Sequence, residues 1–363
     1  MAGLSKAMVV HRLILNTTLI QAVDPLTDSR WLGFMSQHPA ASVFHSPEWL
    51  EALHRTYGYT PVALMMSTTG GEPQSGILYC RVNSWLNGRR LVSLPFSDHC
   101  EPVVTSHDQL CRLLSALGRD AEVNGYKYAE IRPLSSPSIV ECGLGQSQSF
   151  CFHRLSLGGT AAELFHAFHK DCVQRKIHRA EREGLTCEDG RSPDLLQKFY
   201  SLQILTRRRQ QLPPQPFAWF RNLAACMGDK MKIRVASKDG KPVASILTLQ
   251  HRRTLVYKYG CSDKAFSNLG GMQLLFWRAI QDAKSQGLLE FDLGRSDWEN
   301  EGLIRFKDRL GATRSTLTYW RYPASSAAQA TSTWKMNAAK RIISCLPDAC
   351  LSAAGNLLYR HIG

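Results

Sequence analysis

The sequence predicts an α/β (α+β) fold built from two similar halves, each a mixed twisted sheet flanked by helices, with a helical tail at the C-terminus. Its 363 residues exceed the roughly 100–200 residues of one typical domain. Hydrophobic residues make up 44% of the chain and charged residues 20%, as in ordinary globular proteins. One order of predicted elements also occurs twice, which favours a duplication. We expect domains at residues 1–155 and 156–323, and a linker and tail at residues 324–363.

Each predicted half begins with a helix that leads into a β-hairpin. Helical periodicity covers residues 47–58 in the first half and 217–228 in the second, and two strand-like segments joined by a Gly-containing turn follow each helix. A third strand, a long helix and another strand then complete each half, with the long helices predicted at residues 108–125 and 270–287. Chance similarity between two generic α/β patterns is the alternative explanation of this repeat.

The eleven cysteines predict neither a disulfide framework nor a metal site. Their number is odd, and the chain has no C-x-x-C motif and no zinc-type Cys/His spacing. We interpret them as small hydrophobic residues of a protein in a reducing compartment. The apolar segment at residues 8–15 is interrupted by His11 and Arg12, and it is too short for a signal sequence or a membrane span. We therefore expect a cytoplasmic protein.

The formal net charge of +14 lies entirely in the second half. Residues 1–160 hold 12 Lys/Arg and 12 Asp/Glu, whereas residues 161–363 hold 32 and 18. Such a field attracts nucleotide phosphates, nucleic acid or an anionic membrane surface. An amphipathic helix predicted at residues 162–184 places Arg175 and Arg179 on one side, which makes them candidate substrate-binding residues. A solvated basic surface without a ligand is the alternative.

A strand, a polar loop and a helix predict an anion-binding site in the second half. The loop ends in Asn268, Leu269, Gly270 and Gly271, and a helix follows immediately. Backbone N–H groups at a helix N-terminus lack partners and carry partial positive charge, and glycines allow a phosphate to come close. Lys264 in the loop adds a charge of the same sign. These five residues are candidates for binding a pyrophosphate, and a plain turn is the alternative.

Polar residues follow the last strand of this pattern, FDLG. Arg295 and Ser296 come directly after it, and we expect them to lie over the sheet edge and bind substrate. A short helix ended by Gly311 then contains Lys307, whose ammonium group could stabilise an oxyanion or bind a phosphate. A surface lysine without a role is the alternative for Lys307.

Two tyrosines and one aspartate complete the candidate site. Tyr257 and Tyr259 alternate with Lys258 on the strand before the glycine loop, so we expect both phenols on one face of the strand. Either phenol could act near a leaving group, and half-buried sheet aromatics are the alternative. We expect Asp98, in a loop of the first half, to contact an acceptor in the cleft between the halves.

Several segments together resemble the FemAB-like proteins of the GNAT (N-acetyltransferase) superfamily. The resemblance covers roughly residues 40–322. It is carried, in chain order, by FHSPEWLEAL, LVSLPFSDHCEP, QRKIHRAEREGL, the strand-loop-NLGG-helix, FDLGRS and GLIRFKDRLGA.

The resemblance implies two tandem GNAT folds and acyl transfer to an amine. In GNAT enzymes the loop before the central helix binds the pyrophosphate of acyl-CoA, a role that maps here to residues 268–271. In Fem transferases the donor is aminoacyl-tRNA, the acceptor is a peptidoglycan precursor bearing a diphosphate, and the lysine of the F-K motif, here Lys307, lies near the transfer site. Relatives of this type are also associated with bacterial exopolysaccharide assembly, which implies an amino sugar on a lipid carrier as acceptor.

We therefore expect an N-acyltransferase that moves an acetyl or aminoacyl group to an amine of a cell-envelope polysaccharide or peptidoglycan precursor. The donor stays open between acetyl-CoA or another acyl-CoA and aminoacyl-tRNA, because the long helical arm of many tRNA-using Fem transferases has no counterpart in this sequence. The expected partners are an acceptor linked to a nucleotide or lipid diphosphate and, with the second donor, tRNA. We expect no metal cofactor. A non-catalytic module that binds an anionic polymer or lipid-linked sugar is the alternative.

The tail has two predicted helices separated by Pro347. Met336, Ala339, Ile343 and Leu346 form an apolar stripe on the first of them. This stripe could lie on the inner face of a membrane that carries a lipid-linked acceptor. Packing of the tail on the body of the protein is the alternative.

Overall fold

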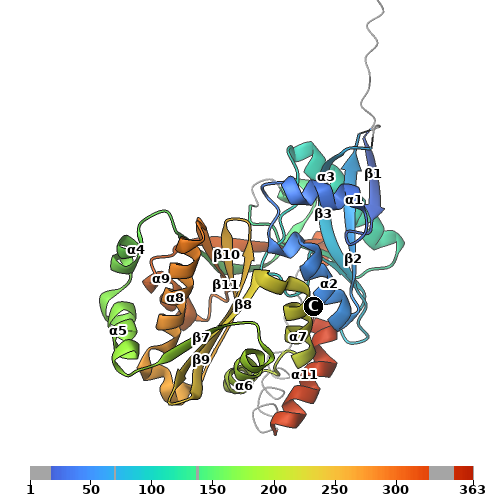
Figure 1. Ribbon diagram of the computed structural model, residues 1–363. Coiled ribbons are helices and arrows are strands. Elements are labelled where there is room, and N and C mark those ends of the chain that lie inside the picture. The colour runs from blue at the N-terminus through green and yellow to red at the C-terminus, as the bar shows by residue number, and fades with distance from the viewer. Residues whose placement is uncertain (1–17, 69–70, 136–138, 327–346, 363) are drawn as a thin grey trace, which may run out of the picture.

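The computed structural model describes residues 18–68, 71–135, 139–326 and 347–362 (Figure 1). The apolar segment at residues 8–15 and the apolar stripe of the tail lie outside the described residues. Within the described part of the chain, a single twisted sheet crosses both halves and carries helices on its two faces.

The sheet has twelve strands in the described residues, in the order β1-β2-β3-β4-β5-β12-β6-β11-β10-β9-β8-β7. The first half contributes β1 (Leu19–Val23), β2 (Thr60–Ser67), β3 (Pro73–Val82), β4 (Arg90–Val92), β5 (Ala129–Ile131) and β6 (Gly145–Ser156). The second half contributes β7 (Thr186–Gly190), β8 (Met231–Lys238), β9 (Lys241–His251), β10 (Thr254–Ser262), β11 (Glu290–Ser296) and β12 (Thr313–Tyr322).

Both halves follow the same succession of elements, as the predicted duplication requires. A helix precedes an antiparallel hairpin in each half: α2 (Pro47–Tyr57) before β2–β3, and α7 (Phe217–Met227) before β8–β9. A long helix then joins two parallel strands: α3 (His107–Val123) links β4 to β5, and α8 (Gly271–Ser285) links β10 to β11. The expected α/β fold of two similar units is confirmed.

The last strand of each half completes the sheet of the other half. β6, from the first half, pairs with β11 of the second, and β12, from the second half, pairs with β5 of the first. The two exchanged strands also pair antiparallel with each other at the centre of the sheet. The boundary near residue 155 therefore marks where the duplicated pattern begins again. The division into domains at this residue stays a prediction, because the two units share one sheet.

Helices cover both faces of the sheet, so inner strands such as β2, β3, β8 and β9 are largely buried on both sides. α2, α7 and α6 (Pro193–Arg209) lie on one face, where the ring centroids of Trp49 and Trp219 are 5.3 Å apart and join the halves. α3 covers the other face in the first half, and α8 covers it in the second. Strands buried on both sides have nearly continuous apolar sequence, as in β2, where alternate residues enter the two cores.

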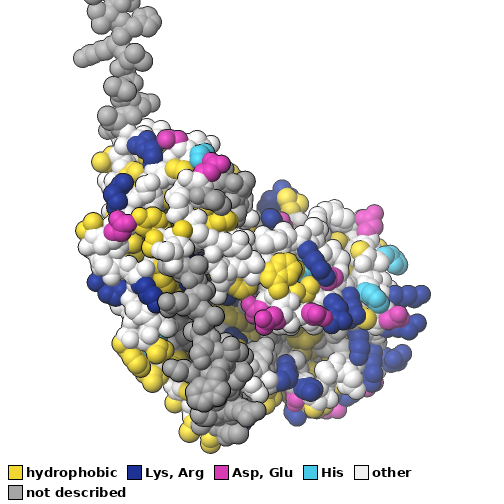
Figure 2. All heavy atoms as spheres, turned by 180° about the vertical axis from the view of Figure 1, so that it is seen from behind, with side chains coloured by type: hydrophobic (Ala, Val, Ile, Leu, Met, Phe, Trp, Pro, Cys, Tyr) yellow, Lys and Arg dark blue, Asp and Glu magenta, His cyan; other side chains and the backbone are white. Residues whose placement is uncertain are grey.

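The basic segment predicted as one helix at residues 162–184 is broken. α4 (Ala161–Ala167) ends at Phe168, whose backbone is extended, and a π-helical turn and α5 (Arg175–Arg182) follow. The prediction missed the break because Phe168 fits the apolar stripe of a helix, although its buried ring packs edge-on against Trp277 of α8. Lys and Arg side chains gather at the end of the molecule that α4 and α5 form (Figure 2).

The last helix of the tail packs on the body of the protein. α11 (Asp348–Ile362) receives a hydrogen bond from Tyr59 in the first half, at 3.2 Å to the carbonyl of Tyr359, and Tyr359 donates at 3.1 Å to the carbonyl of Pro213 in the second half. Gly355 faces the neighbouring carbonyl of Pro214 so closely that a Cβ would lie 2.0 Å from it. The helix thus bridges the halves, as the second alternative for the tail predicts. No helix among the described residues is long and apolar enough to cross a membrane.

We predict that Gly355→Ala lowers the melting temperature, because the added methyl group must push α11 away from the Pro214 carbonyl. Gly33→Ala is the matched control: it adds the same atom to α1 (Ser29–Gln37), where no atom lies within 4 Å, and should raise stability by up to about 1 kcal/mol. Thermal denaturation of both variants measures the difference. Equal stabilisation by both changes would contradict the packing of α11.

Candidate active site

The candidate site lies where the parallel strands β10 and β11 stop pairing. Their parallel pairing ends at Val256 and Asp292. β10 then has a bulge at Tyr257–Tyr259, and β11 has one at Asp292–Gly294. Bulges bend a strand and re-aim its side chains, and they are common beside active sites. A cavity of about 430 Å³ lies here, lined by residues of both strands, of α6 and of α9 (Glu301–Arg309).

Six of the residues predicted for the site line this one cavity. They are Asp98 from the first half and Tyr257, Tyr259, Arg295, Ser296 and Lys307 from the second. Residues that lie far apart in the sequence therefore meet at the junction of the halves. Their roles in binding or catalysis stay predictions.

The bulge in β10 separates the two tyrosines. Tyr257 packs in the core around α8, whereas Tyr259 packs in the core on the opposite face of the sheet and accepts a hydrogen bond from Trp219 Nε1 at 2.9 Å. The prediction that both phenols share one face is wrong, because the extra residue Lys258 shifts the alternation. Burial raises the pKa of both phenols well above the usual value, so each keeps its proton at neutral pH.

A buried ion pair joins the halves inside the cavity. Lys258 Nζ lies 3.2 Å from Asp98 Oδ1, and Arg295 Nε lies 3.8 Å from the same oxygen. Burial alone would raise the pKa of Asp98, but the charges of Lys258 and Arg295 outweigh it and lower the pKa. Tyr319 fixes the loop further by donating to the Asp98 carbonyl at 2.7 Å and accepting from Arg295 at 2.8 Å. Asp98 is thus a negatively charged anchor for two cations.

Lys307 is buried beneath the bulge of β11. Only 1% of it is exposed, and its ammonium group donates to the carbonyls of Gly294 at 2.9 Å and Arg295 at 3.1 Å. An ammonium group has three N–H donors, so one remains for the cavity that Lys307 lines. Burial lowers the pKa of Lys307 to about 8, while Asp98 and Asp292 partly oppose the shift.

A second buried pair holds the β11 bulge in shape. Asp292 accepts a hydrogen bond from the Gly294 N–H at 2.7 Å, and its other oxygen lies 2.9 Å from His99 Nε2. His99 comes from the same loop as Asp98 and is 4% exposed. Gly294 has a φ of 70°, in the left-handed region that glycine adopts without strain. The loop of the first half therefore supports the geometry of the second half.

Only some residues of the predicted anion-binding loop line a second cavity. A cavity of about 290 Å³ adjoins the first and shares Tyr257 with it, and Gly271 in the first turn of α8 lines it. Gly270 is instead packed against the basic segment, where a Cβ would lie 2.2 Å from the carbonyl oxygen of Lys176. Its need for glycine thus comes from this contact and from a φ of 84°.

The other predicted binding residues lie outside the described lining of both cavities. Lys264, Asn268 and Leu269 belong to an exposed 3-10 helix before α8. Arg175 and Arg179 are exposed on the basic segment and pair with acidic residues of that segment. The structure does not bring these five residues to the candidate site, and their predicted contacts with a donor or substrate remain untested.

Sequence reasoning missed three contributors to the site. Lys258, Arg207 and His99 are not among the candidate site residues of the sequence, and Lys258 enters there only as the residue between the two tyrosines. Lys258 carried a usable signal, because a lysine inside an otherwise apolar strand must find a counter-charge when it is buried. No local signal shows that Asp98 supplies it, since the two residues are far apart in the chain.

Comparison with known proteins identifies the fold. Residues 168–308 match the family model of an acetyltransferase (GNAT) domain. The structure described as FemX superposes with a TM-score of 0.65 at 13% identity, covering 80% of this chain and 94% of that one. A tandem GNAT protein from the clavulanic acid biosynthesis pathway gives 0.57 at 10% identity, covering 86% and 100%. The fold is therefore that of a tandem GNAT protein.

One curated protein is similar in sequence to part of this chain. The UDP-N-acetylmuramoylpentapeptide-lysine N(6)-alanyltransferase of Weissella viridescens is 26% identical over 143 residues, which are 37% of this chain and 41% of that protein. This chain thus matches less than half of the relative's length. The chain is thus similar to a GNAT domain over residues 168–308 and to part of this alanyltransferase, and its fold is similar to that of FemX.

We predict that Asp98→Asn destabilises the protein by about 3–5 kcal/mol, because it leaves the buried ammonium of Lys258 without its counter-charge. The double variant Asp98→Asn/Lys258→Met should recover much of this loss. Urea unfolding of the wild type, both single variants and the double variant measures the coupling between the two residues. Additive losses would contradict a direct ion pair between the halves.

Proposed function

We propose that the protein transfers an aminoacyl group to a primary amine of a cell-envelope precursor, a peptidoglycan precursor in the first instance. The observation that carries this proposal is Lys307, a buried lysine held against a strand bulge with one donor left for the cavity. The similarity of the fold to FemX and the partial match to the alanyltransferase support the same chemistry.

Direct acyl transfer to an amine requires few catalytic groups from the protein. The neutral acceptor amine attacks the acyl carbonyl, and a tetrahedral oxyanion forms. The ester C–O bond then breaks, and the proton lost by the attacking nitrogen passes to the departing hydroxyl oxygen of the donor, without a covalent enzyme intermediate. An ammonium donor fixed in a site of low water content can stabilise that oxyanion. Two backbone carbonyls already hold the Lys307 ammonium group in place for this task.

The charge of the cavity suits a substrate that carries phosphate. Lys258, Arg295, Arg207 and Lys307 line it, and the carboxylate of Asp98 is already shared between two of these cations. Ser296 Oγ is buried and has no hydrogen-bond partner among the described residues, so it can accept one from a ligand. An acceptor linked to a nucleotide or lipid diphosphate would satisfy both features.

Acetyl-CoA is the second candidate donor, after aminoacyl-tRNA, and the position of the second cavity favours it. The 290 Å³ cavity reaches the first turn of α8, whose N–H groups can bind a pyrophosphate. Gly270 precedes this turn and has no side chain with which to cap it. Against this donor, the basic segment packs on Gly270 itself and narrows the approach to the helix end.

Transfer assays with purified protein should distinguish the donors. We expect incorporation of labelled alanine from alanyl-tRNA into UDP-N-acetylmuramoyl-pentapeptide or its lipid-linked form, with [14C]acetyl-CoA tested in parallel. Lys307→Met should lower kcat/KM by about 10²–10³, the usual cost of losing one oxyanion donor. Lys127→Met, an exposed lysine of the first half, is the matched control and should leave the rate unchanged. Binding of these ligands without turnover would favour the non-catalytic alternative.

The pH dependence should report the charge of Lys307. Because its pKa is lowered to about 8, the ammonium form is complete below that value and is lost as the pH rises through it. We expect kcat/KM to fall above about pH 8 in the wild type. In Lys307→Arg the guanidinium keeps its charge, so the fall should move to higher pH. Because deprotonation of the acceptor amine affects both proteins alike, a wild-type profile identical to that of Lys307→Arg above pH 8 would contradict the role of Lys307 as a charged donor.

A further inference from the structure

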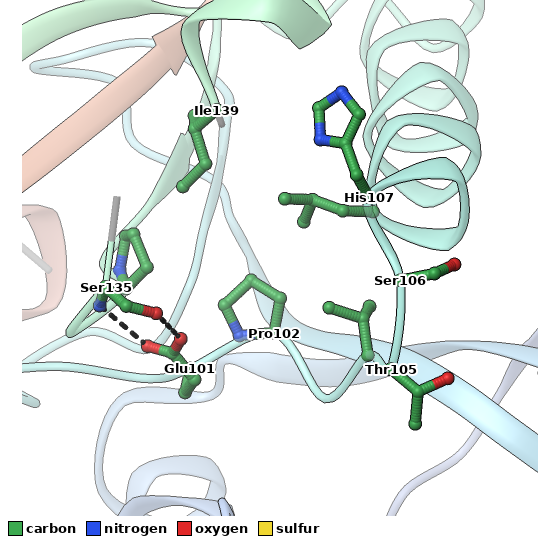
Figure 3. Close-up of a pocket in the computed structure, with 10 residues that line it drawn as sticks. Glu101, Pro102, Thr105, Ser106, His107, Ser135 and Ile139 are labelled. Atoms are coloured by element: carbon green, nitrogen blue, oxygen red, sulfur yellow. Dashed lines mark hydrogen bonds between the residues drawn. The ribbon is translucent and has the colours of Figure 1, made fainter. Parts of the chain in front are cut away.

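A second chemically distinctive cluster lies in the first half, at the start of α3. This helix is the counterpart of α8 in the duplicated fold, and a cavity of about 260 Å³ adjoins its first turn. His107, Leu110, Ile139 and Glu101 line this cavity, and Glu101 accepts hydrogen bonds from Ser135 (Figure 3). None of these residues belongs to the candidate active site.

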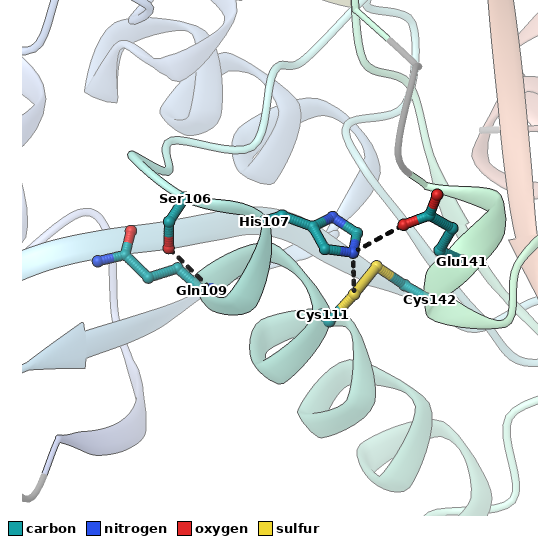
Figure 4. The surroundings of a disulfide bond; sticks show 6 residues. All are labelled: Ser106, His107, Gln109, Cys111, Glu141 and Cys142. Carbon is teal, nitrogen blue, oxygen red and sulfur yellow. Dashed lines mark hydrogen bonds and ion pairs between the residues drawn. A yellow bond between two sulfur atoms is a disulfide. The ribbon is translucent and has the colours of Figure 1, made fainter.

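Four potential metal ligands converge beside this cavity. Cys111 and Cys142 form a disulfide that ties the first turns of α3 to the short helix at residues 140–142. His107 Nε2 lies 3.4 Å from Cys111 Sγ and 3.2 Å from Glu141 Oε2, and Figure 4 shows the imidazole pointing toward both. The imidazole nitrogen and the two sulfurs all lie within 4.8 Å of one another.

The disulfide corrects the interpretation of the cysteines as buried hydrophobic residues. Neither Cys111 nor Cys142 is fully buried, and each lies beside a polar side chain. The sequence has no local zinc-type spacing because the residues of this cluster come from separate segments of the chain. His107 and Cys111 are one helical turn apart, whereas Cys142 is 31 residues from Cys111 and reaches them only through the fold.

The geometry of the cluster matches a tetrahedral zinc site once the disulfide is open. With Zn–S near 2.3 Å and Zn–N near 2.0–2.1 Å, a tetrahedral ion separates its nitrogen and sulfur ligands by about 3.6 Å. His107 Nε2 and Cys111 Sγ are already 3.4 Å apart. Two sulfurs on one zinc are about 3.8 Å apart. Cys142, which is partly exposed in a short 3-10 helix, must therefore move away from Cys111.

We propose that the reduced protein binds one zinc ion through His107, Cys111 and Cys142, with Glu141 as the fourth ligand. A dithiol reductant first supplies two electrons and two protons, so that the S–S bond breaks, two thiols form and the reductant becomes a disulfide. Zn²⁺ then displaces both thiol protons and binds the two thiolates, the neutral imidazole and the carboxylate.

Both states fasten the same two segments. The disulfide joins α3 to residues 140–142 when the protein is oxidised, and the metal joins them when it is reduced. α3 covers one face of the first-half sheet, and its anchorage is thus maintained in either redox state.

Cobalt titration of the full chain, reduced with a phosphine that does not bind metal, tests the site. We expect one Co²⁺ per chain, with a sulfur-to-cobalt charge-transfer band and the intense visible bands of a tetrahedral site, and displacement of Co²⁺ by an equimolar amount of Zn²⁺. Oxidation with a diamide reagent before the titration should abolish the spectrum, and renewed reduction should restore it.

Variants separate this site from adventitious binding. Cys111→Ser and Cys142→Ser should each lower the charge-transfer absorbance at least twofold, and His107→Ala should weaken cobalt binding at least tenfold. Cys187→Ser is the matched control, because Cys187 is an exposed free cysteine outside the cluster, and it should bind normally. An unchanged spectrum in Cys111→Ser, an octahedral spectrum in the reduced wild type, or no binding at all would overturn the proposal. Circular dichroism of each variant confirms that it is folded.

Discussion

The candidate site depends on one inserted residue. Lys258 interrupts the alternation of β10, and the resulting bulge sends the flanking tyrosines to opposite faces of the sheet. An ammonium group at that position is buried, and it is tolerable only because Asp98 from the other half supplies a carboxylate at 3.2 Å. The same carboxylate binds Arg295, and the loop that carries it also holds His99 against Asp292. One ion pair thus links the two halves inside the cavity and sets much of the charge there.

The two halves have the same succession of elements but different sites. In the second half, β10 and β11 separate around a cationic cavity beside α9, and the start of α8 reaches an adjoining cavity. In the first half, the equivalent parallel pair is only three residues long in each strand, and the start of α3 is tied down by a disulfide. This difference agrees with the charge distribution, since the excess of Lys and Arg lies in the second half. The first half acts here as a support, through the loop of Asp98 and His99.

Much of the fold was predictable, because its signals are local. The helices at α2, α3, α7 and α8 have clear periodicity, and the hairpins have Gly-containing turns, so the duplication could be inferred from the sequence. The exchange of β6 and β12 could not, since the sequence of a strand does not specify its neighbour. The break at Phe168 was missed because a buried aromatic residue fits a helical stripe whether or not the helix is continuous.

The sequence predicted several residues of the candidate site, but it did not predict how their side chains are oriented. Lys307, Arg295 and Ser296 follow a recognisable strand end, and they do meet Asp98 in one cavity. The predicted orientation of the tyrosines was wrong, because the alternation of residues along a strand does not reveal where a bulge occurs. Gly270 was predicted to contact a phosphate, but it packs against the backbone of the basic segment. No local sequence pattern indicates this contact.

The exchanged strands bear on how the chain acquires its structure during synthesis. β5 emerges from the ribosome early, but its partner β12 is among the last strands to be made, so the edge of β5 stays open during most of translation. Contacts between segments so distant in the chain slow folding, and an unpaired strand edge is a template for association with other chains. The short length of β5, three residues, keeps that exposed edge small until the second half arrives.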